Sequence, residues 1–137
     1  MLLRQGAIYW VMDCPPLHGT IAAPHAVIVI QPPSKLKDPA APVLCVAISS
    51  SVPRPDASHV PMPNAQQNRP CTTGLTKPCW AVTDWILLVR DRSKLHPYCG
   101  HIGGATLRKI VVKATEAIIA GRMPRAHPPD KAPRQTG

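Results

Sequence analysis

The sequence predicts a mainly β protein: a small, closed or half-closed barrel with one helix packed on it near the C-terminus. Three observations predict this class: short runs of β-branched and aromatic residues, proline-rich connections between them, and a change to helical periodicity after residue 104. The 137 residues suit one domain, and 45% of them are hydrophobic, which argues against full disorder. Because Phe is absent, the core is expected to be aliphatic. The 18 prolines exclude a long coiled coil.

Five segments have the character of strands. Residues 7–12 are aromatic and β-branched, while residues 26–30 and 43–49 are continuous apolar runs, which predicts strands buried on both faces. Residues 80–89 are a fourth strand, with a bulge expected at Thr83 and Asp84. Residues 59–63 contain two prolines, so we expect at most a short edge strand there.

The remaining connections are expected to be irregular. Polar, proline-rich or glycine-rich composition predicts loops over residues 17–24, 31–42 and 64–78 and a turn over residues 96–104.

A helix is predicted after residue 104, with Thr106 as its N-terminal cap and Gly121 at its end. Residues 1–120 are therefore predicted to form a single domain. Residues 121–137 lack periodicity and are rich in proline and basic residues, which predicts a disordered tail. The apolar stripe of the helix consists of Leu107, Ile110, Val111, Ala114 and Ile118.

The formal net charge is +9, which favours a polyanion or an acidic protein as partner. The alternative is a basic composition with no specific partner.

The longest purely aliphatic run, residues 26–30, is far too short to span a membrane, and the N-terminal segment does not match a signal peptide. We therefore expect a cytoplasmic protein whose five cysteines are free thiols.

Five short segments resemble, in the right order, a known family. They are residues 6–11 (GAIYWV), 16–20 (PLHGT), 25–31 (HAVIVIQ), 46–50 (VAISS) and 74–84 (GLTKPCWAVTD). Together with the C-terminal helix they resemble the MazF/PemK/Kid family, the mRNA interferase toxins of type II toxin-antitoxin systems. The resemblance implies an SH3-like barrel of the MazF/PemK/CcdB type, a homodimer with an RNA groove across its interface, single-stranded RNA as substrate, an acidic antitoxin as partner, and no cofactor.

The chain departs from this family where the chemistry is expected. His25 stands in place of the family's catalytic Arg, Ser49 in place of its Thr, and Val82 in place of the Arg found in Kid-type members. Two functions therefore stay open. One is a toxin that cleaves single-stranded mRNA as a metal-independent endoribonuclease. The other is a catalytically inactive module that binds an antitoxin or nucleic acid.

Metal-free RNA cleavage requires a base, an acid and a group that stabilises charge on the phosphate. His25 is the candidate for acid or for charge stabiliser, and Asp84 for base or for a group that orients His25. Ser49 completes the predicted catalytic set. Each also has a structural alternative: a strand-end histidine bonded to a carbonyl, a bulge residue and a turn former. The predicted substrate-binding residues are His18, Thr20, Ser50 and Arg54.

Other chemistries are less well supported by the sequence. Cys71, Cys79, Cys99 and His101 are the right residue types for zinc, but seven residues separate the first two cysteines, where compact zinc sites leave about two to four. No cysteine lies at a glycine-flanked elbow, and the chain has no P-loop. No metal site is predicted.

Overall fold

The computed structural model describes residues 3–67 and 69–128. These ranges hold a seven-stranded sheet with two α-helices and one short 3-10 helix. In chain order the elements are β1 (Ala7–Cys14), β2 (Ala23–Val29), α1 (Pro33–Leu36), β3 (Val43–Ser49), β4 (His59–Pro61), β5 (Trp80–Val89), η1 (Arg92–Lys94), β6 (Tyr98–His101), α2 (Gly104–Ile119) and β7 (Arg125–His127).

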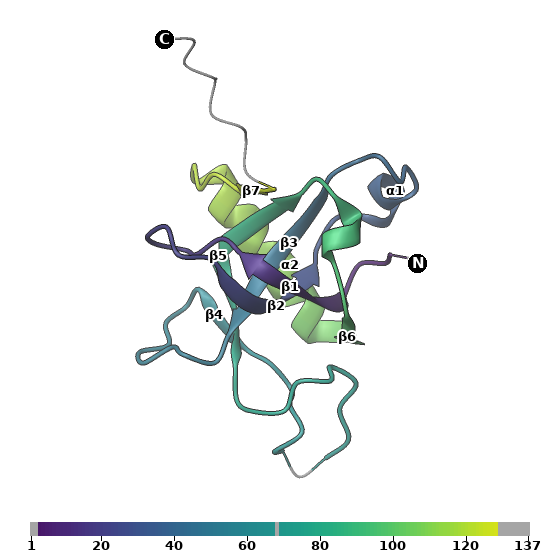
Figure 1. Ribbon diagram of the computed structural model, residues 1–137. Helices are drawn as coiled ribbons and strands as arrows, with labels where there is room; N and C mark the ends of the chain where they lie inside the picture. Colours follow the sequence, from purple (N-terminus) through teal and green to yellow (C-terminus); the bar gives the residue numbers. More distant parts are fainter. Residues whose placement is uncertain (1–2, 68, 129–137) are drawn as a thin grey trace.

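The sheet is a curled antiparallel half-barrel with strand order β4-β5-β3-β2-β1-β6. The one exception in direction is β7, which pairs in parallel with β5. Figure 1 shows α2 behind the sheet and the long connection between β4 and β5 extending below it. The expected mainly β architecture with a C-terminal helix is confirmed.

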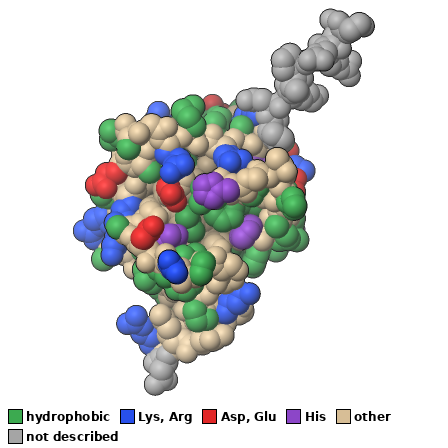
Figure 2. Space-filling model, turned by 90° about the vertical axis from the view of Figure 1, so that its left-hand side faces the viewer, with side chains coloured by type: hydrophobic (Ala, Val, Ile, Leu, Met, Phe, Trp, Pro, Cys, Tyr) green, Lys and Arg blue, Asp and Glu red, His purple; other side chains and the backbone are tan. Residues whose placement is uncertain are grey.

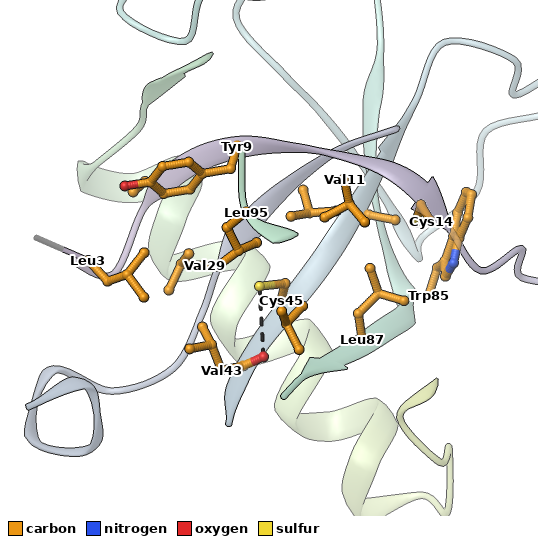
Figure 3. Close-up of a cluster of buried hydrophobic side chains, with 14 of the residues drawn as sticks. Leu3, Tyr9, Val11, Cys14, Val29, Val43, Cys45, Trp85, Leu87 and Leu95 are labelled. Carbon is orange, nitrogen blue, oxygen red and sulfur yellow. Dashed lines mark hydrogen bonds between the residues drawn. The ribbon is translucent and has the colours of Figure 1, made fainter. Parts of the chain in front are cut away.

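Both faces of the central strands are buried, as the continuous apolar runs predict. On β2, Val27 and Val29 face one hydrophobic cluster, whereas Ala26 and Ile28 face a second. The first cluster fills the concave side of the sheet and extends from Leu3 to the indole of Trp85 (Figure 3). The alternation follows from the two-residue period of a strand, which sends successive side chains to opposite faces.

The second cluster is closed by α2. Ile110 and Ala114 are fully buried in it, and Leu107, Val111 and Ile118 pack around them, so the predicted apolar stripe is the face that contacts the sheet. Burying a side chain the size of Ile110 contributes roughly 1.5–3 kcal/mol. The helix thus supplies the outer layer that a sheet buried on both faces requires.

The N-terminal cap of the helix lies three residues earlier than the sequence predicts, at Gly103 instead of Thr106. Gly103 occupies the N-cap position without a side-chain cap, and Gly104 takes a φ of 62°. Glycine adopts this conformation without strain, so the chain enters the helix at Gly104 and Thr106 lies inside it. At the other end Gly121, with a φ of 100°, follows the last turn as predicted.

Three segments expected to be irregular contain regular structure. The turn predicted over residues 96–104 holds β6, which pairs with β1 and has no apolar run to reveal it. The loop predicted over 31–42 holds α1, started by Pro33 and anchored by buried Leu36. Residues 17–24 contain the first two residues of β2.

The segment expected to be a disordered tail from residue 121 also contains a strand. Within β7, His127 is 2% exposed, and its backbone carbonyl accepts a hydrogen bond from the backbone N–H of Arg90. Arg125 donates from its guanidinium to the carbonyl of Leu17. These long-range contacts hold a short segment that has no periodicity of its own. Residues 129–137 of the expected tail lie outside the described residues.

Candidate functional site

His25 lies near the start of β2 with a defined ring orientation. Its Nδ1 is 3.2 Å from the backbone oxygen of Ile48 on β3, and its ring meets that of Trp85 edge-to-face at 4.8 Å. A carbonyl oxygen only accepts hydrogen bonds, so Nδ1 carries the proton in this contact. In the neutral ring Nε2 is then the nitrogen with the free lone pair.

Trp85 is itself fixed in place. Its indole N–H donates to the carbonyl of Pro15 at 3.0 Å, and its side chain is 7% exposed within the concave cluster. The irregularity in the pairing of β3 with β5 spans this part of β5, where the sequence predicts a bulge at Thr83 and Asp84. The bulge therefore lies in the part of β5 that carries Trp85, whose ring contacts His25.

His25 opens onto a cleft of about 330 Å³, which we name the His25 cleft. Such a volume is at the small end of ligand sites. Figure 2 shows histidine side chains on the face seen from the left of Figure 1, among hydrophobic and basic side chains and with acidic ones beside them. The residues that line the cleft include Trp10, His25, Ser50, Leu75, Lys77 and Cys79.

The far wall of the cleft is a loop clamped to β6. His101 donates its backbone N–H to the carbonyl of Thr72, and Thr72 returns a hydrogen bond from its hydroxyl to the carbonyl of His101. Cys99 donates from its thiol to the carbonyl of Thr73. Gly74 has a φ of 71°, and a Cβ there would collide with the Cys99 backbone. Glycine thus allows the loop to lie against β6 and present Leu75 and Lys77.

The serines at the end of β3 lie beside this cleft. The pairing of Val27 with Ala47, continued by two residues, places Ser49 opposite His25. Ser49 is 8% exposed, and its Oγ accepts a hydrogen bond from the backbone N–H of Ser51, as in the turn-forming alternative. Ser50 is exposed and lines the His25 cleft directly.

The other predicted binding residues lie outside the His25 cleft. Arg54 lines a neighbouring cleft of about 370 Å³, together with Ser49 and the ring of Trp85. His18 and Thr20 are exposed on the loop between β1 and β2 and are not among the residues that line either cleft.

Asp84 is not brought together with His25. Its Oδ2 lies 3.6 Å from a guanidinium nitrogen of Arg122, and both side chains line a third cavity, of about 470 Å³, at the end of α2. Its Oδ1 is buried without a hydrogen-bond partner. Among the described residues, no hydrogen bond or ion pair joins Asp84 to His25. The structure favours the structural alternative for this carboxylate.

Sequence reasoning missed Trp10, Lys77 and Arg122 as members of these cavities. The available signal for Lys77 was its place in the GLTKPCW segment, where it is the only charged residue before Trp80. Arg122 was assigned to the tail, and its contact with Asp84 is visible only once α2 has packed on β5.

The cysteines form no cluster suited to metal binding. Within residues 3–67 and 69–128, no three His, Cys, Asp or Glu side chains lie together as metal ligands. Burial raises the pKa of Cys79 to about 11 and that of Cys14 to about 12, so both thiols are protonated at neutral pH. None of the helices in this part of the chain is long and apolar enough to cross a membrane.

A curled antiparallel sheet with one C-terminal helix places the chain among small half-barrel proteins. The family model "PemK-like, MazF-like toxin of type II toxin-antitoxin system" matches residues 4–117, and the chain belongs to this family. No curated protein sequence matches it.

Two solved structures of similar fold come from mycobacteria. One is described as an endoribonuclease from a Mycobacterial species; it is 18% identical, with a TM-score of 0.61 over 86% of this chain and 92% of that chain. Another is the Mycobacterium tuberculosis toxin MazF-mt6, 15% identical, with a TM-score of 0.61 over 84% of this chain and 97% of that chain. At these identities the likeness concerns the fold.

Proposed function

We propose that this protein is the toxin of a type II toxin-antitoxin pair and cleaves single-stranded RNA without a metal ion. Family membership and the likeness to a mycobacterial endoribonuclease support the class of activity. The observation that carries the proposal for this chain is the orientation of His25, whose Nδ1 is held by Ile48 so that Nε2 is left for proton transfer.

His25 is assigned to proton transfer during attack by the ribose 2′-hydroxyl. Neutral Nε2 accepts the 2′-hydroxyl proton as that oxygen attacks phosphorus, and the imidazolium then gives the proton to the departing 5′ oxygen. The products are a 2′,3′-cyclic phosphate and a free 5′-hydroxyl. Ser49 and Ser50 are assigned to donate hydrogen bonds to phosphate oxygens. Asp84, paired with Arg122 in another cavity, has no step in this scheme.

The proposal also includes partners and location. The net charge of +9 suits both RNA and an acidic antitoxin, and the family likeness supports a homodimer acting in the cytoplasm. His18, Thr20 and Arg54, on the loops that flank the strand ends, are proposed to contact the RNA beyond the His25 cleft. A short acidic protein that co-purifies with the chain would identify the antitoxin.

A cleavage assay tests the proposal. The protein is incubated with a long RNA in the presence of EDTA, alongside His25→Ala and, as a matched control, the exposed His96→Ala. We expect His25→Ala to lower the cleavage rate by about 10²–10⁴ and His96→Ala to leave it unchanged. Cleavage that persists in His25→Ala would refute the assignment of His25.

The second candidate is a binding module that has kept the fold without the reaction. The observation that favours it is His25 itself, because no guanidinium stands where the family's Arg is expected. If the chain binds RNA with strong salt dependence but does not cut it, this second function replaces the first.

A further inference from the structure

We propose that the His25 cleft binds one nucleotide of a single-stranded RNA, with the ammonium of Lys77 holding its phosphate. This inference rests on the proposed function. His25 stands at the family's Arg position and carries a positive charge only when it is protonated, so the inference assigns the positive charge of the cleft to Lys77. Lys77 reaches the cleft from the loop that is clamped to β6, whereas His25 reaches it from β2.

The position of Lys77 in the cleft follows from the residues around it. Lys77 lines the same cavity as His25, Ser50 and Cys79. The positive charge of Lys77 also lowers the pKa of Cys79, against the larger effect of burial, which raises it. Cys79 is 6% exposed and lines the same cleft, so Lys77 and Cys79 lie close together in its wall.

The charge of Lys77 is available for a ligand. None of the described residues that line the cleft is acidic. The nearest carboxylates in sequence are engaged elsewhere: Asp84 pairs with Arg122, and Asp91 accepts hydrogen bonds from Ser93. A phosphate is therefore the group that the cleft attracts, whereas a carboxylate on the protein would have neutralised the lysine.

The floor of the cleft suits the uncharged part of a nucleotide. Trp10 is half-buried, and Leu75 and Cys79 are buried beside it. Burial raises the pKa of Cys99, and a hydrogen bond with the Trp10 side chain opposes that rise, so the indole lies beside a residue of β6. A planar aromatic floor beside a cation is the combination that binds single-stranded nucleic acid through base and backbone together.

Arg54 is the competing cation, and the geometry places it elsewhere. It lines the neighbouring cleft together with Ser49 and Trp85. A phosphate beside His25 and Ser50 is thus reached by Lys77, while Arg54 serves an adjoining part of the strand. We therefore expect different effects on RNA binding when the charge of Lys77 or that of Arg54 is removed.

The test measures binding separately from cleavage. A short single-stranded 2′-O-methyl oligonucleotide of mixed sequence, labelled for fluorescence anisotropy, binds without being cut because it lacks the attacking hydroxyl. Affinity is measured across a salt series for the unaltered chain, Lys77→Gln and Lys77→Arg. Lys35→Gln, which removes the same charge from exposed α1, is the matched control.

We expect Lys77→Gln to weaken binding several-fold and to lower the slope of log K against log salt by about 0.7, the value for one lost phosphate contact on a single strand. Lys77→Arg is expected to retain the slope, and Lys35→Gln to match the unaltered chain. Equal slopes for Lys77→Gln and Lys35→Gln would overturn the inference.

Cleavage of a long RNA by the same variants distinguishes this inference from the proposed function. If the unaltered chain cuts RNA and Lys77→Gln reduces the rate by about 10²-fold while Lys77→Arg retains most of it, both stand. If no variant cuts RNA but the Lys77-dependent slope is present, the proposed reaction fails and the nucleotide site stands. Cleavage with no dependence on Lys77, in rate or in slope, refutes the site alone.

Discussion

A single hydrogen bond decides which nitrogen of His25 can do chemistry. The protonated Nδ1 donates a hydrogen bond to the Ile48 carbonyl, so Nε2 is the basic atom of the neutral side chain. The edge-to-face contact with Trp85 holds the ring from another side. The same sequence position could have held a histidine whose ring served only to end a strand. The contact with Ile48 satisfies that structural alternative and orients the ring at the same time.

Asp84 provides the sharpest contrast with His25. Its ion pair with Arg122 is partly exposed, with side-chain exposures of 28% and 49%, so we expect Asp84→Asn to cost at most about 1 kcal/mol of stability. RNA cleavage is expected to stay close to that of the unaltered chain. The measurement is the cleavage rate, together with urea unfolding of Asp84→Asn, Arg122→Gln and the double variant. A folded Asp84→Asn protein without activity would return this carboxylate to the active site.

His127 predicts how stability depends on pH. Burial lowers its pKa from the ordinary value, and Lys94 adds to this effect, while Asp13 at 2.8 Å and Asp91 oppose it. An unfolded chain therefore binds a proton more readily than the folded one. The contribution of neutral, buried His127 to the free energy of unfolding is therefore full above the ordinary histidine pKa of about 6.5. It is lost progressively as the pH falls below that value.

The measurement is urea unfolding over a pH series from slightly alkaline to mildly acidic. We expect the free energy of unfolding to fall with pH below about 6.5 and the fall to be smaller in His127→Gln. An identical pH dependence in the two proteins would show that His127 is not its source.

The C-terminal strand β7 is short, yet it closes an edge of β5. Its backbone pairs with Leu87 and Val89, both fully buried in the concave cluster. Two arginines reinforce it from outside the ladder: Arg125 bonds the Leu17 carbonyl, and Arg90 bonds the Pro128 carbonyl. A segment with this many long-range partners acts as part of the sheet rather than as an appendage.

Truncation tests this role. Ending the chain after Met123 removes β7, and we expect a loss of about 2 kcal/mol or more in unfolding free energy, since several hydrogen bonds and the burial of His127 are lost together. The matched control ends after Pro128 and keeps β7. The difference in thermal midpoint between the two truncations measures the strand alone; equal midpoints would contradict its structural role.

Charge is the property that belongs to the chain as a whole. The net charge is +9, and Asp56 and Asp91 are held in turns while Asp84 is held in an ion pair, so the molecule presents a positive field to any single-stranded polyanion. We expect the affinity for a 2′-O-methyl oligonucleotide to fall at least about tenfold when the salt concentration rises from low to physiological. A fall of this size corresponds to the release of several counterions on binding. Salt-independent binding would show that the charge has no part in recognition.

The sequence correctly predicted those elements that a local residue pattern is enough to identify. The apolar runs at 26–30 and 43–49 predicted strands buried on both faces, and the stripe from Leu107 to Ile118 predicted the helix face that packs on them. His25 was found because a family position was occupied by an unexpected residue type. These features are local or repeat along the chain, so one-dimensional patterns reveal them.

What the sequence determined by itself is the composition of each layer, the order of the longer strands and the C-terminal helix, and the identity of the imidazole at the strand end. The tertiary structure alone decided which groups share a cavity: Lys77 with His25, Asp84 with Arg122, and β7 with β5. These pairs are separated by dozens of residues, and a contact of that kind depends on how strands bend and loops are clamped. Periodicity describes which side chains face inward, but it carries no information on which distant side chains meet.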